Sequence, residues 1–565
     1  MSIRSFELWD YVIFVLCMCV SAGIGVYHGF FHGGQKTTEE YYYGNRQMGA
    51  LPLALSLLVT YQSSIFLLGY PGEMYVYGSM FWLSFIGVSL GFLLIAWFVV
   101  PLLHPLQIRS AFQYLEKRYD HVAPRKVASF LSVILYGGFK AVIWADVFQS
   151  IIIIIGLVAL LSKGLISVNG GIQKVWDICE DNQRIEFNEF SGDITVRHTV
   201  WGMVIGKAVE FFSLGFTQLI VQRVSSARTV REAQKAVFIA IPGFIVYGSV
   251  ACLLGLIVFA YNTQKGCDPL EQKIIRSPNQ VLPYFVMDVF RELPGLPGVF
   301  LAALFSASLS TLSSGLNSLP TITWEDFMKP LFPEVSDMKA TLIGKILVIV
   351  YGGIAIAVAY LVVLVGGPIV QVTSTISSCI GGPVCGMFVL GATFKMANYK
   401  GAMVGCLASF AFLLWIALGA VLQYRYPRLP GSVTDKCPGF SSMSLNVTGL
   451  NPNTTLSQSE MDFSARSTAP EILWVYRISY VWYTFIGIVL CVMIGLIVSV
   501  LTGGLRSSNE VKSQHLFWVR RLFDRENKSN EKRPSLYREA DPQIFLPEMK
   551  EALNFKSGDP AKHDP

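Results

Sequence analysis

Residues 297–318 read PGVFLAALFSASLSTLSSGLNS, so seven hydroxyl side chains gather at the end of an apolar run. An unpaired polar group in the hydrocarbon of a bilayer costs several kcal/mol, and a membrane helix that concentrates hydroxyls usually lines an ion path or an ion site. Ser310 and Thr311 lie about 100° apart around the helix, and Ala307 lies one turn before Ser310. Two hydroxyls and a backbone carbonyl would form half of an oxygen cage for a small hard cation. The alternative is that the hydroxyls bond back to their own helix or allow close helix packing.

The composition places this helix in a membrane protein. Of 565 residues, 53% are hydrophobic and 15% are charged, whereas a soluble chain carries about 25% charged residues. The sequence therefore predicts an all-α polytopic membrane protein. The first apolar run follows Glu7 and Asp10 and lacks a basic start, which indicates a transmembrane helix and not a cleaved signal peptide. No HExxH or P-loop pattern occurs, so we expect neither an enzyme nor a bound cofactor, and no nucleic-acid partner.

Apolar windows of about 20 residues, the length that crosses roughly 30 Å of hydrocarbon, occur eleven times. A twelfth run, Val127–Phe139, has 13 uncharged residues and reaches only about 20 Å as a helix, so it is too short to cross. The transmembrane domain is predicted to cover residues 1–505. The eleven spans are expected near 10–30, 48–70, 78–103, 141–162, 199–222, 236–261, 297–319, 341–365, 368–394, 399–423 and 474–502.

Loop charges predict how the chain is oriented in a plasma membrane. The tail, residues 506–565, carries twelve Lys and Arg residues, so we expect it to be cytoplasmic by the positive-inside rule. Counting crossings backwards puts the N-terminus and the loop 424–473 outside, and this loop holds two glycosylation acceptors, Asn446 and Asn453. The loop 223–235 falls inside. Its basic residues agree with that side, and they are Arg223, Arg228, Arg231 and Lys235.

The same count meets a conflict at the short run. The loop 104–126 is basic and belongs inside, yet the span near 141–162 must also begin inside. Both flanks of 127–139 therefore require the same side of the membrane. Either this run is re-entrant, or the chain lacks one crossing.

Most of the ten cysteines lie in apolar spans, where they act as small hydrophobic residues. Cys179, Cys267 and Cys437 lie in predicted loops instead. One pair among them would form a disulfide if those loops are extracellular, and Cys267–Cys437 is the preferred pair.

Polar residues inside the spans are candidates for function. Asp146, three residues before Gln149 on the same helix face, would be an ion ligand or an interfacial residue stabilised by the helix dipole. Lys207 and Glu210 are spaced to neutralise each other towards the bundle interior. The cluster at 60–64, Thr-Tyr-Gln-Ser-Ser, suits a broken helix whose free carbonyls bind a cation, or a polar stripe on an intact helix.

Several of these segments together resemble one family of transporters. They are GALPLALSLLVTYQSS at 49–64, KAVIWADVFQ at 140–149, VQRVSSART at 221–229 and PGLPGVFLAALFSASLSTLSSGLNSLPTITWEDF at 294–327. Over about residues 8–505 the chain is similar to the sodium:solute symporter family, closest to its branch of sodium-dependent multivitamin and sodium-coupled monocarboxylate transporters.

This resemblance implies a core of two inverted five-helix repeats with flanking helices, with thirteen spans in the family and twelve here. It implies uptake of a small organic anion, such as biotin, pantothenate or a monocarboxylate, driven by sodium through alternating access. It also implies three sets of site residues. The sodium ligands would be Val59, Gln62, Ala307, Ser310 and Thr311, a second cation position would use Ser63, Asp146 and Gln149, and substrate contacts would come from Tyr61, Phe66, Thr217 and Gln218.

The chain also departs from the pattern of that family. Thr217 replaces an Asn, Phe66 replaces a smaller polar residue, and Lys207 and Glu210 stand where relatives are uncharged. Between Gly137 and Gly138 the chain omits about forty residues that in the family complete one core helix and form the next. This omission would explain why both flanks of 127–139 require the same side of the membrane. The alternative function is therefore a truncated, transport-deficient form that acts as a non-transporting or regulatory membrane protein.

Overall fold

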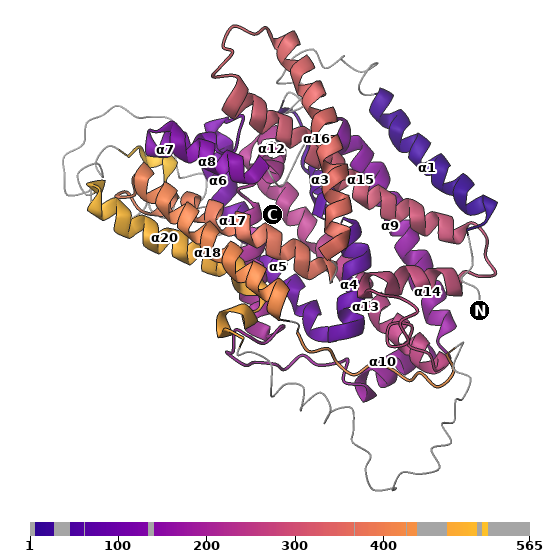
Figure 1. Ribbon diagram of the computed structural model, residues 1–565. Helices are drawn as coiled ribbons and strands as arrows, with labels where there is room; N and C mark the ends of the chain where they lie inside the picture. Colours follow the sequence, from indigo (N-terminus) through magenta and orange to yellow (C-terminus); the bar gives the residue numbers. More distant parts are fainter. Residues whose placement is uncertain are drawn as a thin grey trace, which may run out of the picture. The chain divides into compact units, whose positions relative to one another are not determined.

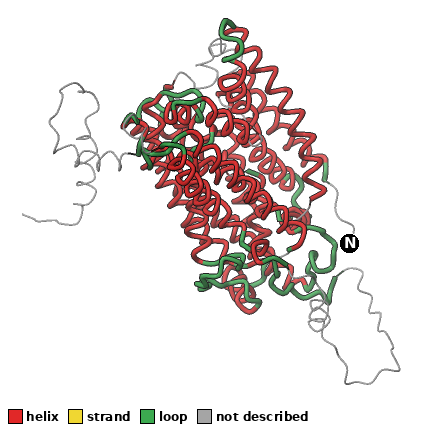
Figure 2. The backbone as a smooth tube through the Cα atoms, turned by 60° about the vertical axis from the view of Figure 1, so that its left-hand side comes forward, coloured by secondary structure: helices red, strands yellow, loops and turns green. Residues whose placement is uncertain are grey.

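Helices make up the regular structure of the protein (Figure 1). The computed structural model describes residues 6–27, 46–61, 63–133, 140–365, 368–424, 426–437, 472–504 and 511–517, and it leaves out some side chains within them, including those of residues 140–147. In these ranges there is no strand, and one isolated parallel bridge joins Met48 to Ala227. Figure 2 shows the described loops gathered at the two ends of the helical bundle. The all-α prediction is confirmed.

The predicted spans fall on helices. Seven continuous stretches of the described chain are long and apolar enough to cross a membrane, and two bent pairs bring the total to nine. α1 (Leu8–Val26) and α15 (Leu296–Ile322) have shorter apolar stretches. The seven continuous stretches are Ser79–Leu106, Phe148–Ser167 in α9 (Lys140–Ser167), α13 (Val230–Lys265), Met338–Ala357 in α16 (Asp337–Val365), α17 (Ile369–Thr393), α18 (Tyr399–Gln423) and Tyr480–Leu501, which contains η10 (Tyr480–Trp482) and α20 (Tyr483–Leu501).

Two spans are broken within the bundle. α3 (Ala50–Tyr61) and α4 (Ser64–Tyr77) meet at 55°, which is the broken helix that the sequence analysis gave as one of two alternatives for the polar cluster at 60–64. The span predicted as one helix over 199–222 is also broken, so that prediction was wrong: η6 (Gly202–Gly206) and α11 (Lys207–Leu214) meet α12 (Gln218–Ser226) at 65°. The second break lies at Gly215, where an added Cβ would approach the Ile95 side chain to 2.7 Å.

The interpretation of 104–126 as a loop was wrong in part. The stretch Ser79–Leu106 consists of η3 (Ser79–Leu83), α5 (Ser84–Leu94), η4 (Ile95–Val99), α6 (Val100–Leu103) and η5 (His104–Leu106). It is followed by α7 (Gln113–Tyr119) and α8 (Val122–Val133). The short apolar run at 127–139 therefore continues a helix that begins five residues earlier, at Val122. Its last residues, 134–139, lie outside the described residues.

The packing places the first broken span between three other helices. α9 contacts α3 and α15, and α13 contacts both α3 and α4. α17, α18 and α20 contact one another and run side by side in Figure 1. Glycine allows the close approach of α18 to α20, because a Cβ at Gly405 would lie 2.4 Å from the carbonyl oxygen of Cys491.

A disulfide joins Cys267, just after α13, to Cys437, and we call this side of the bundle the disulfide end. This is the pair that the sequence analysis preferred. Cys179 lies in α10 (Gly171–Asp181) and not in a loop, and its thiol is buried and directed to the carbonyl oxygen of Leu256 at 3.5 Å. The amphipathic pattern of α10 explains the difference, because Val175, Ile178 and Cys179 share its buried face.

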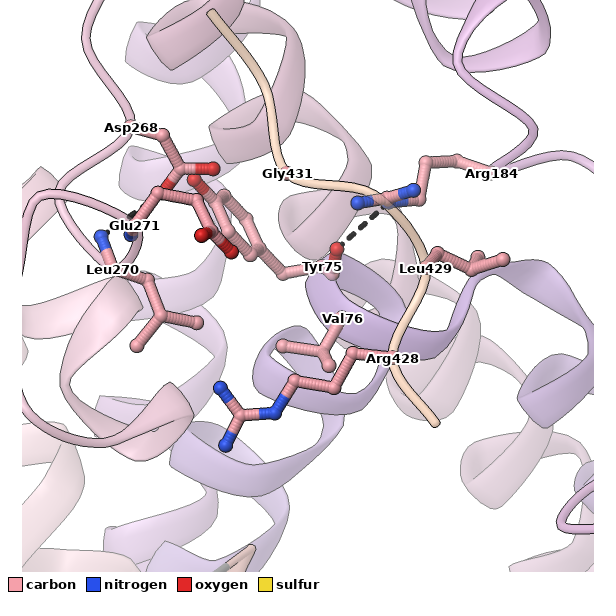
Figure 3. A pocket seen from close by; sticks show the side chains of 9 residues that line it. All are labelled: Tyr75, Val76, Arg184, Asp268, Leu270, Glu271, Arg428, Leu429 and Gly431. Atoms are coloured by element: carbon pink, nitrogen blue, oxygen red, sulfur yellow. Dashed lines mark hydrogen bonds between the residues drawn. The ribbon is translucent and has the colours of Figure 1, made fainter. Parts of the chain in front are cut away.

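Arg184 connects its own segment and the segment around Pro430 to the disulfide end of α4 by hydrogen bonds (Figure 3). Its guanidinium donates to the carbonyl oxygens of Tyr75 at 2.8 Å and Pro430 at 2.6 Å. Asp268 binds the same segment that contains Pro430, since its carboxylate accepts from the amide of Ser432 at 3.0 Å. Arg184 and Asp268, which hold these loops together, both line the small pocket in Figure 3.

Arg197 also connects separate helices at this end. This residue was not identified from the sequence. Its guanidinium donates to both carboxylate oxygens of Glu73 on α4, at 2.8 and 3.0 Å, and to Gln371 on α17 at 2.6 Å. It lies over the rings of Tyr77 at 3.9 Å and Tyr480 at 5.1 Å. A buried charge is tolerated when it is paired and hydrogen-bonded, as the two terminal nitrogens of Arg197 are, and the aromatic faces add cation–π attraction. Arg197 therefore joins α4, α17 and η10 through one buried cation.

The opposite end of the bundle is held by Asp326 in η8 (Thr323–Met328). Its carboxylate accepts from Ser110 at 2.7 Å, from Ser129 on α8, and from Arg125 Nε at 2.8 Å. Arg125 also donates to the carbonyl oxygen of Glu325 at 2.7 Å. One buried carboxylate thus gathers α8, η8 and the segment before α7.

A short piece of the predicted tail packs on this same end. The amide of Phe517 donates to the carbonyl oxygen of Ala392 at the end of α17, at 3.0 Å. Tyr114 on α7 donates to the carbonyl oxygen of His515 at 2.7 Å, and Leu516 is fully buried. The rest of the tail, residues 506–510 and 518–565, lies outside the described residues.

We expect Glu73→Gln to destabilise the protein strongly, because it leaves the buried Arg197 cation without its counter-charge. Breaking one partner of a buried ion pair costs about 3–5 kcal/mol. The measurement is the thermal unfolding midpoint of purified protein in detergent. The control is Lys235→Gln, which removes the exposed partner of Glu232 at 3.4 Å, where a surface pair contributes about 0–1 kcal/mol. Equal midpoints for the two variants would contradict this role of Glu73.

Candidate cation and substrate site

The first helix break supplies free backbone oxygens. α3 ends at Tyr61, so the last carbonyls of this helix, those of Val59 and Thr60 included, lack the usual partner four residues on. Val59 is fully buried and Thr60 is 3% exposed. Ser63 then caps α4, and its hydroxyl accepts from the amide of Ile65 at 3.3 Å. Gln62, the other predicted ligand from this break, lies outside the described residues.

The hydroxyl-rich turn of α15 contacts this break directly. The hydroxyl of Thr311 donates to the carbonyl oxygen of Thr60 at 3.0 Å and to that of Ala307 at 3.3 Å. Ala307 and Ser310 are fully buried in the same turn. The structure therefore brings Thr311, and with it the carbonyl of Ala307, against the end of α3, one residue beyond Val59, and Ser310 lies next to Thr311 in the chain. Two carbonyl oxygens and one hydroxyl converge there, which are the ligand types that a hard cation prefers.

The chemistry of these ligands suits an alkali cation better than a transition metal. Through the described part of the chain, no three His, Cys, Asp or Glu side chains lie close enough to hold a metal ion. Neutral oxygens at helix ends bind monovalent cations in channels and transporters.

The predicted second cation position is described only in part. Gln149 on α9 is 3% exposed, and its amide oxygen has no hydrogen-bond partner within the described residues. Ser306, on the α15 helix that packs against α9, is also buried with its hydroxyl oxygen unpartnered among those residues. Such groups are rare in folded proteins and are often satisfied by an ion or water. The side chain of Asp146 lies outside the described residues.

Two of the predicted substrate residues lie among aromatic side chains. The Tyr61 ring is 6.1 Å from the ring of Phe92 and 6.0 Å from that of Phe211. Phe66, on the first turn of α4, lies 4.5 Å from the ring of Tyr70. These rings form an apolar wall beside the first helix break.

The other two predicted substrate residues lie at the second break. Thr217 precedes α12 in extended conformation, and its hydroxyl donates to the carbonyl oxygen of Leu214 at 2.6 Å. The amide oxygen of Gln218 accepts from the amide of Ala111 at 2.7 Å, and its nitrogen donates to the carbonyl of Arg109 at 3.0 Å. Both polar atoms of Gln218 are therefore engaged by the segment before α7.

Lys207 and Glu210 neutralise each other inside the bundle, as predicted from their spacing. Lys207 Nζ lies 2.7 Å from Glu210 Oε2. Ser374 on α17 accepts from Lys207 at 2.9 Å and donates to Glu210 at 2.7 Å. This closed ring of three polar groups satisfies both charges without a further ligand.

Arg223 was counted as a basic loop residue, and that interpretation was wrong. It lies in α12, is 1% exposed, and donates from Nε to the Ser56 hydroxyl at 3.1 Å and from Nη2 to the Thr60 hydroxyl. The sequence does offer a signal for this, because Leu219 to Val224 is apolar apart from Gln222 and Arg223 and would continue the predicted span. The predicted span 199–222 ends at the residue before Arg223, and for this reason the burial of Arg223 was missed.

Comparison with known proteins agrees with this architecture. The model of the sodium:solute symporter family matches residues 41–136 and 129–409. The chain is 35% identical over 549 residues to the sodium-dependent multivitamin transporter of Oryctolagus cuniculus, with 89% of this chain and 84% of that protein covered. It is 32% identical to sodium-coupled monocarboxylate transporter 1 of Xenopus laevis, with 90% and 88% covered, and 33% identical to the sodium/iodide cotransporter of Homo sapiens, with 89% and 85% covered.

A solved structure supports the fold. It is described as the substrate-bound outward-open state of a Na+-coupled sialic acid symporter. It matches with a TM-score of 0.65 and 20% identity, covering 88% of this chain and 98% of that one.

The matches also bear on the omission expected near Gly137. The family model matches in two pieces that overlap at residues 129–136, which places a discontinuity there. The alignment with the Oryctolagus cuniculus protein runs over 549 positions, although only 89% of the 565 residues take part, so several tens of positions have no residue in this chain. With its membrane-spanning helices and with matches over most of its length, this multi-pass membrane protein belongs to the sodium:solute symporter family.

Proposed function

We propose that the protein is a sodium-coupled symporter that carries a small organic anion across the plasma membrane. The observation that carries this proposal is the contact between Thr311 and the carbonyl oxygen of Thr60, which brings the hydroxyl turn of α15 onto the end of the first broken helix. Sodium would be held there by the carbonyls of Val59, Gln62 and Ala307 and the hydroxyls of Ser310 and Thr311. A second cation would bind near Gln149, with Asp146 and Ser63.

The substrate would lie between the two helix breaks. α4 and α12 both begin at a break, and the free amides at a helix N-terminus attract a carboxylate. Tyr61 and Phe66 would contact the apolar part of the substrate, and Thr217 and Gln218 would border it at the other break. The names of the relatives favour a vitamin such as biotin or pantothenate, or a monocarboxylate. Lys207 is an unsuitable anchor for the anion, because Glu210 already neutralises it.

The disulfide end would face the outside of the cell and the Asp326 end the cytoplasm. A disulfide persists in an oxidising compartment, and the loop that follows Cys437 carries the acceptors Asn446 and Asn453, which lie outside the described residues. The basic tail would then be cytoplasmic. Sodium would enter from the disulfide end, and the membrane potential would add roughly 2.3 kcal/mol per charge per 100 mV.

A second candidate function is a transport-deficient form that regulates or assembles with another membrane protein. The two-piece match to the family model favours it, because a core helix is expected to be missing. Uptake of labelled substrate by cells that express only this chain separates the two functions. Sequencing the transcript across codons 135–140 shows whether the omission is present in the message.

We expect Thr311→Val to raise the sodium concentration for half-maximal uptake about tenfold or more, because it removes an oxygen ligand while keeping the side-chain shape. The measurement is uptake of labelled biotin, pantothenate and lactate against sodium concentration. The control is Ser308→Ala, since the Ser308 hydroxyl bonds to the carbonyl oxygen of Leu304 in its own helix at 2.9 Å. If Thr311→Val keeps the wild-type sodium dependence, the proposed site is wrong.

We expect Gln149→Leu to make the sodium dependence of uptake less steep, because it removes a buried amide oxygen from the second cation position. The Hill coefficient for sodium is the quantity to measure. Gln173→Leu on the exposed face of α10 is the control. A Hill coefficient that stays at the wild-type value in Gln149→Leu would argue for a single cation.

A further inference from the structure

Arg223 joins the two broken spans to each other. It belongs to α12, and its guanidinium donates to Ser56 and Thr60, which lie one turn apart on α3. It also donates from Nη1 to the carbonyl oxygen of Leu219 at 3.3 Å in its own helix. The planar fork of an arginine can reach two acceptors at once, which the ammonium of a lysine on its flexible stem does less well.

A second set of contacts joins the same two helices at their far ends. The amide of Met48, just before α3, donates to the carbonyl oxygen of Ser226 at 3.0 Å. Arg228 donates to the carbonyl oxygen of Gln47 at 3.0 Å. α3 is therefore tied to α12 and the residues after it both where α3 begins and near where it ends. A displacement of α12 has to move α3 with it or break these bonds.

Thr60 takes part in both the arginine contact and the candidate cation site. Its hydroxyl accepts from Arg223 and donates to the carbonyl oxygen of Ser56 at 2.7 Å. Its own carbonyl oxygen accepts from Thr311. The side chain that Arg223 holds and the backbone oxygen that faces Thr311 thus belong to one residue, 3% exposed, at the end of a helix.

We propose that Arg223 is a positioning residue for the cation site: by holding Ser56 and Thr60, it fixes the Thr60 carbonyl against Thr311 and makes cation binding depend on the position of α12. The inference rests on the proposed function, because it assigns a cation to the contact between Thr60 and Thr311. It adds a link between the cation at the first helix break and the helix that begins at the second break. The positive charge of Arg223 is itself unfavourable for a nearby cation, so its benefit is geometric.

The test uses Arg223→Lys, which keeps the charge and removes the fork. Full-length protein is purified in detergent, and its thermal unfolding midpoint is followed while sodium chloride replaces choline chloride at constant ionic strength. We expect sodium to stabilise the wild-type protein, and we expect Arg223→Lys to need about tenfold more sodium for half of the effect, the size of one lost hydrogen bond to a charged group. Ser56→Ala, which removes one acceptor of Arg223 and leaves the arginine in place, should shift the sodium midpoint in the same direction.

The control is Arg228→Lys, which alters an exposed arginine that joins the same two segments away from Thr60. We expect it to leave the sodium midpoint unchanged. The opposite outcome is that Arg223→Lys and Ser56→Ala lower the thermal unfolding midpoint equally in sodium and in choline, while the sodium concentration for half of the stabilisation stays at the wild-type value. In that case Arg223 is only structural and the inference is overturned. If the wild-type protein shows no stabilisation by sodium at all, the proposed cation site itself fails, and the inference fails with it.

Discussion

Two helices of this protein stop inside an apolar bundle, and the backbone groups that they release need partners there. A free carbonyl or amide in such surroundings costs several kcal/mol, so the breaks at Tyr61 and Gly215 are possible only where side chains or ligands supply hydrogen bonds. Thr311 supplies one at the first break and Thr217 supplies one at the second. The same requirement explains why a cation site would be found at this point, since a bound cation satisfies the carbonyls of a helix end.

A buried charge holds each end of the bundle, and the two charges have opposite signs. At the disulfide end a buried arginine, Arg197, gathers a carboxylate, an amide and aromatic rings from separate elements. At the other end a buried carboxylate, Asp326, gathers two serines and Arg125. Each cluster joins a half of a broken span or the extension of α15 to helices far away in sequence. Such clusters have few alternative arrangements, because loss of one partner leaves a charge unpaired. They are suited to hold the ends of a bundle in a defined state.

The expected omission near Gly137 lies between α8 and α9, and both of these helices contact α15, which carries part of the candidate cation site. The residues that form that site come from α3 and α15, and α9 and α13 pack around them. The overlap of the two family matches at residues 129–136 lies at the end of α8, which contacts α7, α15, α17, α18 and η8. A chain that lacks a helix there would keep the oxygen ligands of α3 and α15, and the change would reach them through α9, which begins at Lys140 and packs against both helices.

The sequence by itself determined the helical membrane fold and the family, offered the first helix break as one of two alternatives, and predicted a cation site at the turn 307–311. These features depend on local composition and spacing: apolar windows, a polar cluster in the middle of a span, and hydroxyls on one turn. It also predicted the Lys207–Glu210 pair, because both partners lie on one helix. The break at Gly215, the fastening by Arg197 and Glu73, and the burial of Arg223 were decided only by the tertiary structure. In each of these, the partner lies on a distant segment, such as Ile95, Glu73 or Ser56, and no local pattern shows which charged residue will meet its partner inside the bundle.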